Sequence, residues 1–405
     1  MPEHVTVAVE DLTPGGTVDS DIFSQDMSLL VASGVTLTMG IISSFKRRGI
    51  THVQVSANSE MAQLAVPAAR PTAPPPAPVA PSATETEQDR FEHLLERTAE
   101  VYETHGLEQA IPAEALENAT DQMEEFFCEI ELGKEVQMDA IREMSNQLVT
   151  VFTARANLAV KLLDLDRFDR YTYRHSINVG MLYMLIASEW VDDQETLEDL
   201  VFGAMLHDIG KAKVGAEIIN KPGKLDATEW NKMQNHPVWS AEMLEAAGAS
   251  PVAVAIARSH HEKLDGNGYP DKLKGDQLDR FVFLAAICDV YDALTTKRSY
   301  KSKMDFGRAM DIILQGCGTH FHPATANEFI RRVGRYPVGC FVKLSSNEVA
   351  VVLRVNENAI SRPVVSRVLN SDGSERAEGE ELDLSHRSDL FITELVISKE
   401  EPEKK

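Results

Sequence analysis

The chain has 405 residues, of which 43% are apolar and 25% charged, enough for two or three domains with a sizeable core. Asp and Glu number 63 against 40 Lys and Arg, and because a formal net charge of -23 repels polyanions, we expect no binding to a nucleic-acid polymer. The four cysteines form no CxxC pair, so we expect no disulfide framework. We find no signal peptide and no run near the roughly 18 apolar residues of a membrane span. We therefore expect a cytoplasmic protein without membrane segments.

The first predicted element is a small α/β module at residues 1–60, for which a regulatory or interaction role is the simplest interpretation. Strands are predicted at VTVAV (5–9), LLVASGVTLT (29–38) and THVQV (51–55), with a short helix at MGIISSFKRRGI (39–50). Residues 61–87 are dominated by Pro and Ala, which predicts a semi-extended linker.

Helices are predicted from residue 88 to 330. The region 88–165 contains an apolar stripe with heptad-like spacing, formed by Ile141, Met144, Leu148, Val151, Leu158, Leu162 and Leu165. This stripe fits either packing on its own domain or a homodimer seam through 141–165. The region 166–330 holds the candidate chemistry, and residues 331–405 alternate like strands before a charged tail, which predicts a β-rich C-terminal extension.

A histidine followed by an aspartate ends the apolar segment FGAML in FGAMLHDIGKAKVG, residues 202–215. Burial of His207 beside Asp208 costs several kcal/mol unless both are satisfied, and a divalent metal such as iron, manganese, nickel or zinc satisfies both. Lys211, four residues on, would project from the same helical face and could bond a phosphate oxygen. The alternative is a capping Asp208 with Gly210 ending the helix.

The stretch HHEKLDGNGYP, residues 260–270, follows a predicted helix. Successive helical side chains diverge by about 100°, so we expect His260 and His261 to reach different metals, the alternative being one inward and one outward histidine. The turn at Gly266–Pro270 is expected to wall a substrate cleft.

Two aspartates, Asp289 and Asp292, share a helical face in DVYDALTTKRSYK. The face leads to Lys297, Arg298 and Lys301, so Asp289 is a candidate metal ligand followed by cations for phosphate. The alternative is a buried carboxylate paired with Arg298.

Taken together and in order, HDIGK, HHE…DGNGYP and DVYDALTTKRSYK, with His175 and His236, resemble the HD-GYP phosphodiesterases of the HD phosphohydrolase superfamily over residues 166–325. The resemblance implies a mainly α fold: a helical HD-type metal-dependent bundle, here with a small N-terminal α/β domain and a C-terminal β-rich extension. It also implies hydrolysis of cyclic di-GMP to pGpG and/or GMP, by a hydroxide held between metals.

Site residues follow from the same resemblance. The implied metal ligands are His175, His207, Asp208, His236, His260, His261 and Asp289. Asp208, as the bridge between metals, and Lys211 are the implied catalytic residues. The implied substrate-binding residues are Lys211, Gly268, Tyr269, Pro270, Asp292, Arg298 and Lys301.

The sequence departs from the family pattern at two places. Members with three metals have a glutamate where this chain has Tyr171, a poor ligand at neutral pH, so we expect two divalent ions, with iron or manganese favoured and nickel, zinc, magnesium or calcium as alternatives. His322 replaces the usual aspartate of an FDP motif, which predicts a changed helix cap without catalytic effect.

Three other functions compete with cyclic di-GMP hydrolysis. They are an HD-type hydrolase of another nucleotide, a redox enzyme with two irons, and a catalytically weak cyclic di-GMP sensor that docks partners. The family also suggests docking of diguanylate cyclase domains through the GYP loop.

Overall fold

The computed structural model describes residues 4–59, 113–132, 138–153 and 171–396, with short gaps inside the first and last ranges. The chain divides into two compact units. The first comprises residues 1–84, 121–137 and 211–233, and the second residues 85–120, 138–210 and 234–405. The predicted linker at 61–87 lies outside the described residues.

The N-terminal residues form an antiparallel sheet in the order β1-β4-β2-β3. Its strands are β1 (His4–Ala8), β2 (Ile22–Phe23), β3 (Leu29–Val31) and β4 (His52–Ser56), with a 3-10 turn η1 (Val9–Asp11) after β1. Val53 and Val55 alternate inward along β4, and helical residues Ile41, Ile42 and Phe45 complete the core. The predicted α/β character is confirmed, while the two-residue β2 was not predicted.

The C-terminal residues form a second antiparallel sheet, in the order β8-β7-β6-β5-β9. Its elements are β5 (Phe341–Leu344), β6 (Val349–Arg354), β7 (Val364–Leu369), β8 (Glu381–Asp383), η5 (Leu384–His386) and β9 (Ile392–Leu395). The stretch NSDGS (370–374) forms a turn after β7, where Gly373 adopts a positive φ of 81°. The β-rich character is confirmed.

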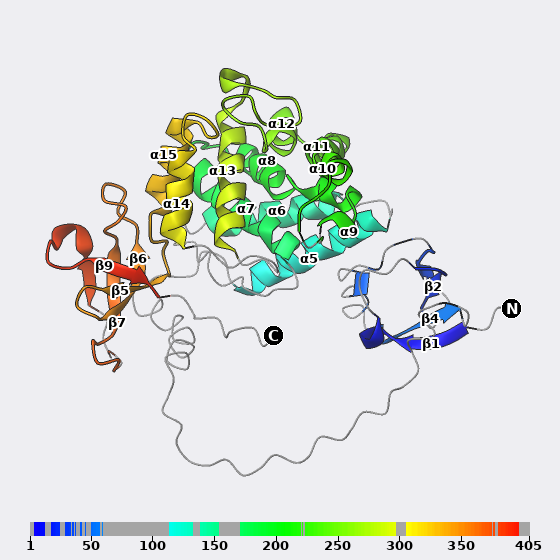
Figure 1. Ribbon diagram of the computed structural model, residues 1–405, viewed down its shortest axis with the longest axis horizontal. Helices are drawn as coiled ribbons and strands as arrows, with labels where there is room; N and C mark the ends of the chain where they lie inside the picture. The colour runs from blue at the N-terminus through cyan, green and yellow to red at the C-terminus, as the bar shows by residue number, and fades with distance from the viewer. Residues whose placement is uncertain are drawn as a thin grey trace, which may run out of the picture. The chain divides into compact units, whose positions relative to one another are not determined.

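Helices and the loops that connect them make up the rest of the described chain (Figure 1). They are α5 (Ala113–Glu131), α6 (Met138–Thr153), α7 (Tyr171–Ala187), α8 (Gln194–Met205), η3 (Ile209–Lys213), α9 (Ala216–Ile219), α10 (Ala227–Met233), α11 (His236–Ala246), α12 (Pro251–Ser259), η4 (Gly275–Gln277), α13 (Arg280–Thr295), α14 (Phe306–Gln315) and α15 (Pro323–Val333). This confirms the mainly α class.

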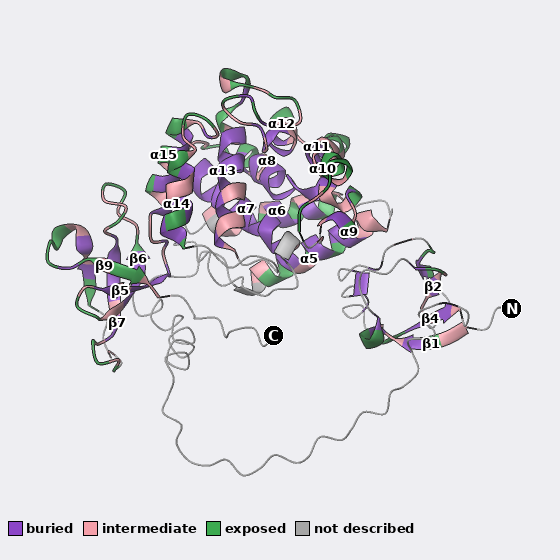
Figure 2. Ribbon diagram, viewed as in Figure 1, coloured by how far each residue is buried: buried purple, intermediate pink, exposed green. Residues whose placement is uncertain are grey.

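The helices of the second unit pack around α7, whose residues 174–187 are buried on every face (Figure 2). A helix with no solvent-exposed side belongs in the middle of a bundle. Helices α8 and α13 contact it, and α12 packs against α8 and α11. Histidine- or aspartate-bearing turns of these five helices therefore come close together.

The apolar stripe of α6 packs inside the chain. Ile141, Met144 and Leu148 are at most 5% exposed, α6 contacts α8, and Arg142 binds Asp199 at 2.9 Å. For this part of the stripe the structure favours packing on its own domain over a dimer seam. Val151 is partly buried, and Leu158, Leu162 and Leu165 lie outside the described residues.

The starts of α10 and α15 differ in their capping bonds. Asp226 and Glu229 form a reciprocal capping pair at the start of α10, where each backbone N–H donates to the other carboxylate at 2.8–2.9 Å. His322 is the N-cap of α15 but its side chain makes no capping bond; its ring packs against Phe283 instead. Among the described residues, none of the helices is long and apolar enough to cross a membrane.

Candidate metal centre

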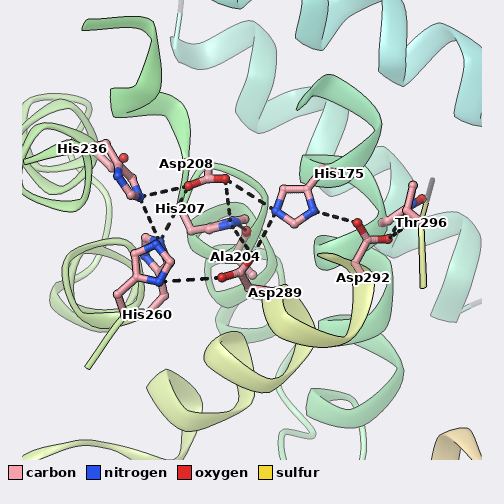
Figure 3. Close-up of polar contacts among 12 residues, drawn as sticks. His175, Ala204, His207, Asp208, His236, His260, Asp289, Asp292 and Thr296 are labelled. Atoms are coloured by element: carbon pink, nitrogen blue, oxygen red, sulfur yellow. Dashed lines mark hydrogen bonds and ion pairs between the residues drawn. The ribbon is translucent and has the colours of Figure 1, made fainter. Parts of the chain in front are cut away.

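Seven predicted ligands converge from five helices of the second unit. Figure 3 labels all of them except His261. They are His175 on α7, His207 and Asp208 after α8, His236 at the start of α11, His260 and His261 at the end of α12, and Asp289 on α13. The apolar FGAML segment anchors one of these ends: Phe202, Ala204 and Met205 are at most 1% exposed, so the next turn is buried too.

The donor atoms fall into two clusters. One contains Asp208, His236, His260 and His261, the other His175, His207 and Asp289, and within each cluster the donor atoms lie within 4.8 Å of one another. Each cluster combines imidazole nitrogens with a carboxylate, the mixture that suits divalent transition metals.

The carboxylate of Asp208 lies between the clusters. Its Oδ1 is 3.1 Å from Nε2 of His236, and its Oδ2 is 3.4 Å from Nε2 of His207 and 3.5 Å from Nε2 of His175. Each oxygen therefore faces a different cluster. That arrangement allows one carboxylate to hold two ions at once.

Asp289 closes the centre from α13. Its Oδ1 is 3.2 Å from Nε2 of His175, and its Oδ2 is 3.8 Å from Nδ1 of His261. Burial acts to raise the pKa of Asp289, but the hydrogen bond and charge of His175 and the charges of His261 and His207 lower that pKa well below its usual range. The carboxylate is therefore ionised, which is the form that binds metal.

A hydrogen bond at Nδ1 turns each of three imidazoles so that its Nε2 faces the centre. Nδ1 of His207 lies 2.7 Å from the carbonyl oxygen of Ala204, and Nδ1 of His260 lies 2.8 Å from that of Ala257. Because a carbonyl oxygen only accepts, each Nδ1 carries the proton and each Nε2 keeps its lone pair. Nδ1 of His175 is bound in the same way, by Asp292 Oδ2 at 2.7 Å.

The donor set fits divalent metal ions. Nε2 of the fully buried His207 makes no hydrogen bond, so no proton donor occupies its lone pair and that lone pair can bind a metal ion. Nε2 of His236 and Nε2 of His260 are 3.3 Å apart, close to the separation of about 3 Å expected for two nitrogens each about 2.1 Å from one ion. Burial, then the charges of neighbouring histidines, lowers the pKa of His260 well below its usual range, which keeps the imidazole neutral.

The structure overturns the expectation that His260 and His261 reach different metals. Both belong to the cluster of Asp208 and His236, with ring centroids 4.1 Å apart. Helix α12 ends at Ser259, so His260 is its C-cap and His261 already lies in the following turn. The divergence of 100° between helical neighbours therefore does not apply.

Asp292 is placed differently from the predicted substrate contact. It is 4% exposed, and its carboxylate accepts bonds from His175 Nδ1, Asn178 Nδ2 at 2.9 Å and Thr296 Oγ1 at 3.0 Å. The side chain therefore orients His175 from behind rather than facing a cleft. Asn178 and Thr296 escaped the sequence analysis, although they stand at i+3 of His175 and i+4 of Asp292 on the same helical faces.

The predicted GYP wall lies against the second histidine of the pair. The Tyr269 ring centroid is 4.7 Å from that of His261, and the Tyr269–Pro270 peptide is cis. A Cβ on Gly268 would lie 2.4 Å from Cα of Glu262, so only glycine allows this approach. Burial, and then the charges of Asp208 and Asp289, raise the pKa of Tyr269, so its phenol stays protonated.

Of the four predicted phosphate cations, Lys211 alone lies among the described residues. Lys211 lies in η3 and belongs to the segment that groups with the first unit. Lys297, Arg298 and Lys301 lie outside the described residues, as does the side chain of Tyr171. Their roles stay predictions.

Comparison with protein families gives two matches. Residues 160–325 match the HD domain, and residues 341–404 match a KOW domain associated with the HD domain. The first match contains all seven candidate ligands. The second contains the C-terminal sheet.

Several curated proteins resemble this chain. A cyclic di-GMP phosphodiesterase of Pseudomonas aeruginosa is 32% identical over 240 residues, 59% of this chain and 58% of that protein. From Vibrio cholerae, a cyclic di-GMP phosphodiesterase is 40% identical over 33% of this chain and 29% of its own, and a 3'3'-cGAMP-specific phosphodiesterase is 34% identical over 39% and 35%. The matches thus span from about a third to about three-fifths of these relatives.

Proposed function

The HD domain of this chain belongs to the HD-GYP family, and from this premise we propose that the protein is a metal-dependent phosphodiesterase that hydrolyses cyclic di-GMP to pGpG and/or GMP. The observation that carries the proposal is the pair of donor clusters with the Asp208 carboxylate between them. A centre of two ions with a carboxylate between them is the usual arrangement for in-line attack on a phosphodiester.

The residues around the centre would divide the work. The first cluster would hold one divalent ion and the second another, with iron or manganese as our first choice. When bound, such ions supply Lewis acidity, which activates water and neutralises charge on the phosphoryl oxygens. We assign the carboxylate of Asp208 to keep the two sites at a fixed separation.

Other groups would set the position of the dinucleotide. The half-buried, protonated phenol of Tyr269 can donate a hydrogen bond to a phosphate or ribose oxygen but cannot act as a base near neutral pH. We assign Gly268, Tyr269 and Pro270 to a wall that excludes water from one side of the site. Lys211, Arg298 and Lys301 would contact phosphate, as the family pattern suggests.

The choice of dinucleotide is the main alternative. Because both cyclic di-GMP and 3'3'-cGAMP phosphodiesterases are among the similar proteins, the second substrate is our runner-up. Docking of a cyclase domain on the GYP loop, a homodimer and a cytoplasmic location stay predictions.

The test is hydrolysis of each dinucleotide by protein purified without oxygen and reconstituted with iron or manganese, with products separated by chromatography. We expect turnover of cyclic di-GMP and none by Asp208→Ala, and the accumulating product distinguishes pGpG from GMP. Faster turnover of 3'3'-cGAMP would move the assignment to that substrate. Binding without turnover with either metal would instead support a sensor.

A further inference from the structure

The loop between α12 and α13 carries the GYP wall and runs over the metal centre with little regular structure. Residues 262–274 contain no helix or strand, and the short η4 follows. The loop turns sharply at Gly266, with a φ of 79°, and at Lys272, with an unusual φ of 56°. Such a segment needs specific contacts to keep one conformation.

One buried carboxylate supplies contacts at the returning side of this loop. Glu262 is 1% exposed, and its Oε1 accepts the backbone N–H of Asp271 at 2.6 Å while its Oε2 accepts that of Leu273 at 3.1 Å. Each oxygen thus holds a different backbone amide. Charge-assisted bonds of this kind are stronger than those between neutral groups.

Glu262, which carries this carboxylate, directly follows the candidate ligand His261 in the chain. The outgoing side of the loop is pressed onto the same backbone, since Tyr269 N–H donates to the carbonyl of His261 at 3.3 Å and Gly268 contacts Glu262 directly. The backbone bond from Tyr269 to His261 holds the outgoing side of the loop, and the Glu262 carboxylate holds the returning side. Together they fix the position of Tyr269 against His261.

A second brace acts from the surface. Arg258, on the last turn of α12, grips Asp271 with two bonds, Nε to Oδ2 at 2.7 Å and a terminal nitrogen to Oδ1 at 2.9 Å. Both side chains are more than a third exposed, so this pair contributes little by itself. The buried contact of Glu262 is the stronger of the two.

We propose that Glu262 is a positioning residue, which holds the Gly268–Tyr269–Pro270 wall at a set distance from the metal centre without touching substrate or metal. The kinetic part of this inference rests on the proposed function. Loosening the loop would weaken the grip on a large cyclic dinucleotide. A small phosphodiester, which does not reach the wall, would react as before.

The test compares Glu262→Gln and Glu262→Ala with the wild-type chain, and with Glu328→Gln on α15 as a matched control. The amide can accept only one of the two backbone bonds, and alanine accepts neither. We expect backbone amides of residues 263–275 to exchange hydrogen about tenfold faster in Glu262→Ala, with Glu262→Gln between it and wild type.

Kinetics provide the second readout. At unchanged metal content, we expect the KM for cyclic di-GMP to rise about tenfold while kcat for bis(p-nitrophenyl) phosphate stays within about twofold. Equal losses on both substrates, or loss of metal, would show a general structural role and overturn the inference. Should Glu262→Ala fail to fold, the glutamine variant decides.

Amide exchange separates the inference from the proposed function. If wild-type protein hydrolyses neither dinucleotide, the proposed function fails, but exchange of residues 263–275 still reports on the loop. Exchange that matches wild type in the Glu262 variants would overturn the positioning role whatever the activity. Faster exchange confined to that loop supports it.

Discussion

Replacing Asp292 with asparagine separates two roles for that residue. Its carboxylate accepts from His175 on Oδ2 and from Asn178 and Thr296 on Oδ1. An asparagine side chain has only one oxygen. In Asp292→Asn the NH2 group therefore faces either the Nδ1–H of His175 or the Nδ2 of Asn178, and the hydrogen bond on that side is lost. Loss of such an orienting contact costs 10- to 100-fold in metal affinity, or about 1.4–2.7 kcal/mol.

The assay is a metal titration of the full chain with Mn²⁺ against a competing chelator. We expect the dissociation constant to rise by about 10- to 100-fold, with a KM for cyclic di-GMP, at saturating metal, within about threefold of wild type. Asp193→Asn is the matched control, because Asp193 caps α8 through Thr196 and asparagine caps helices equally well. A raised KM with unchanged metal affinity would refute the positioning role and restore the substrate contact.

Three further predictions test the centre and the packing around it. Asp208→Ala should lower bound metal and reduce turnover by at least about 100-fold, because it removes a group that faces both clusters; full metal content by elemental analysis would contradict this. Gly268→Ala should lower the free energy of unfolding by about 1–3 kcal/mol in denaturant titrations, whereas Gly307→Ala, where the crowding atoms belong to flexible side chains, should leave it nearly unchanged; equal stabilities would refute the close approach. Leu148→Ala should cost about 2–5 kcal/mol at every protein concentration, since Leu148 packs within the chain, and a concentration-dependent loss would instead indicate a dimer seam.

Much of the fold follows from local patterns in the sequence. Apolar alternation predicts the strands at 341–354 and 364–369, and the predicted helical region 88–330 contains α5 to α14 and most of α15. The strands that escaped prediction are short: β2 has two residues, β8 has three and β9 has four. Such segments bury too few side chains to show a period, and they form because longer neighbours offer them an edge to pair with.

The candidate site shows which information spacing contains and which it lacks. Asp289 and Asp292 do share one face of α13, as their separation predicts, but one turn of helix moves the second carboxylate from the centre to the back of His175. The shared cluster of His260 and His261 depends on where α12 ends, and a helix terminus is the least certain feature of a sequence-based prediction. Tertiary packing sets how deeply a side chain is buried and where a helix ends, and the spacing of residues in the sequence does not encode either.

The ends of α8 and α12 have a consequence for the order of binding. Both helices point their carboxyl ends at the centre, where His207 and His260 each bond a carbonyl of the last turn. The negative poles of two helix macrodipoles thus add to the charges of Asp208 and Asp289, while the positive pole of α11, which begins at His236, opposes them. Without its cations such a site repels a phosphate, so we expect metal to bind first and the anionic dinucleotide second.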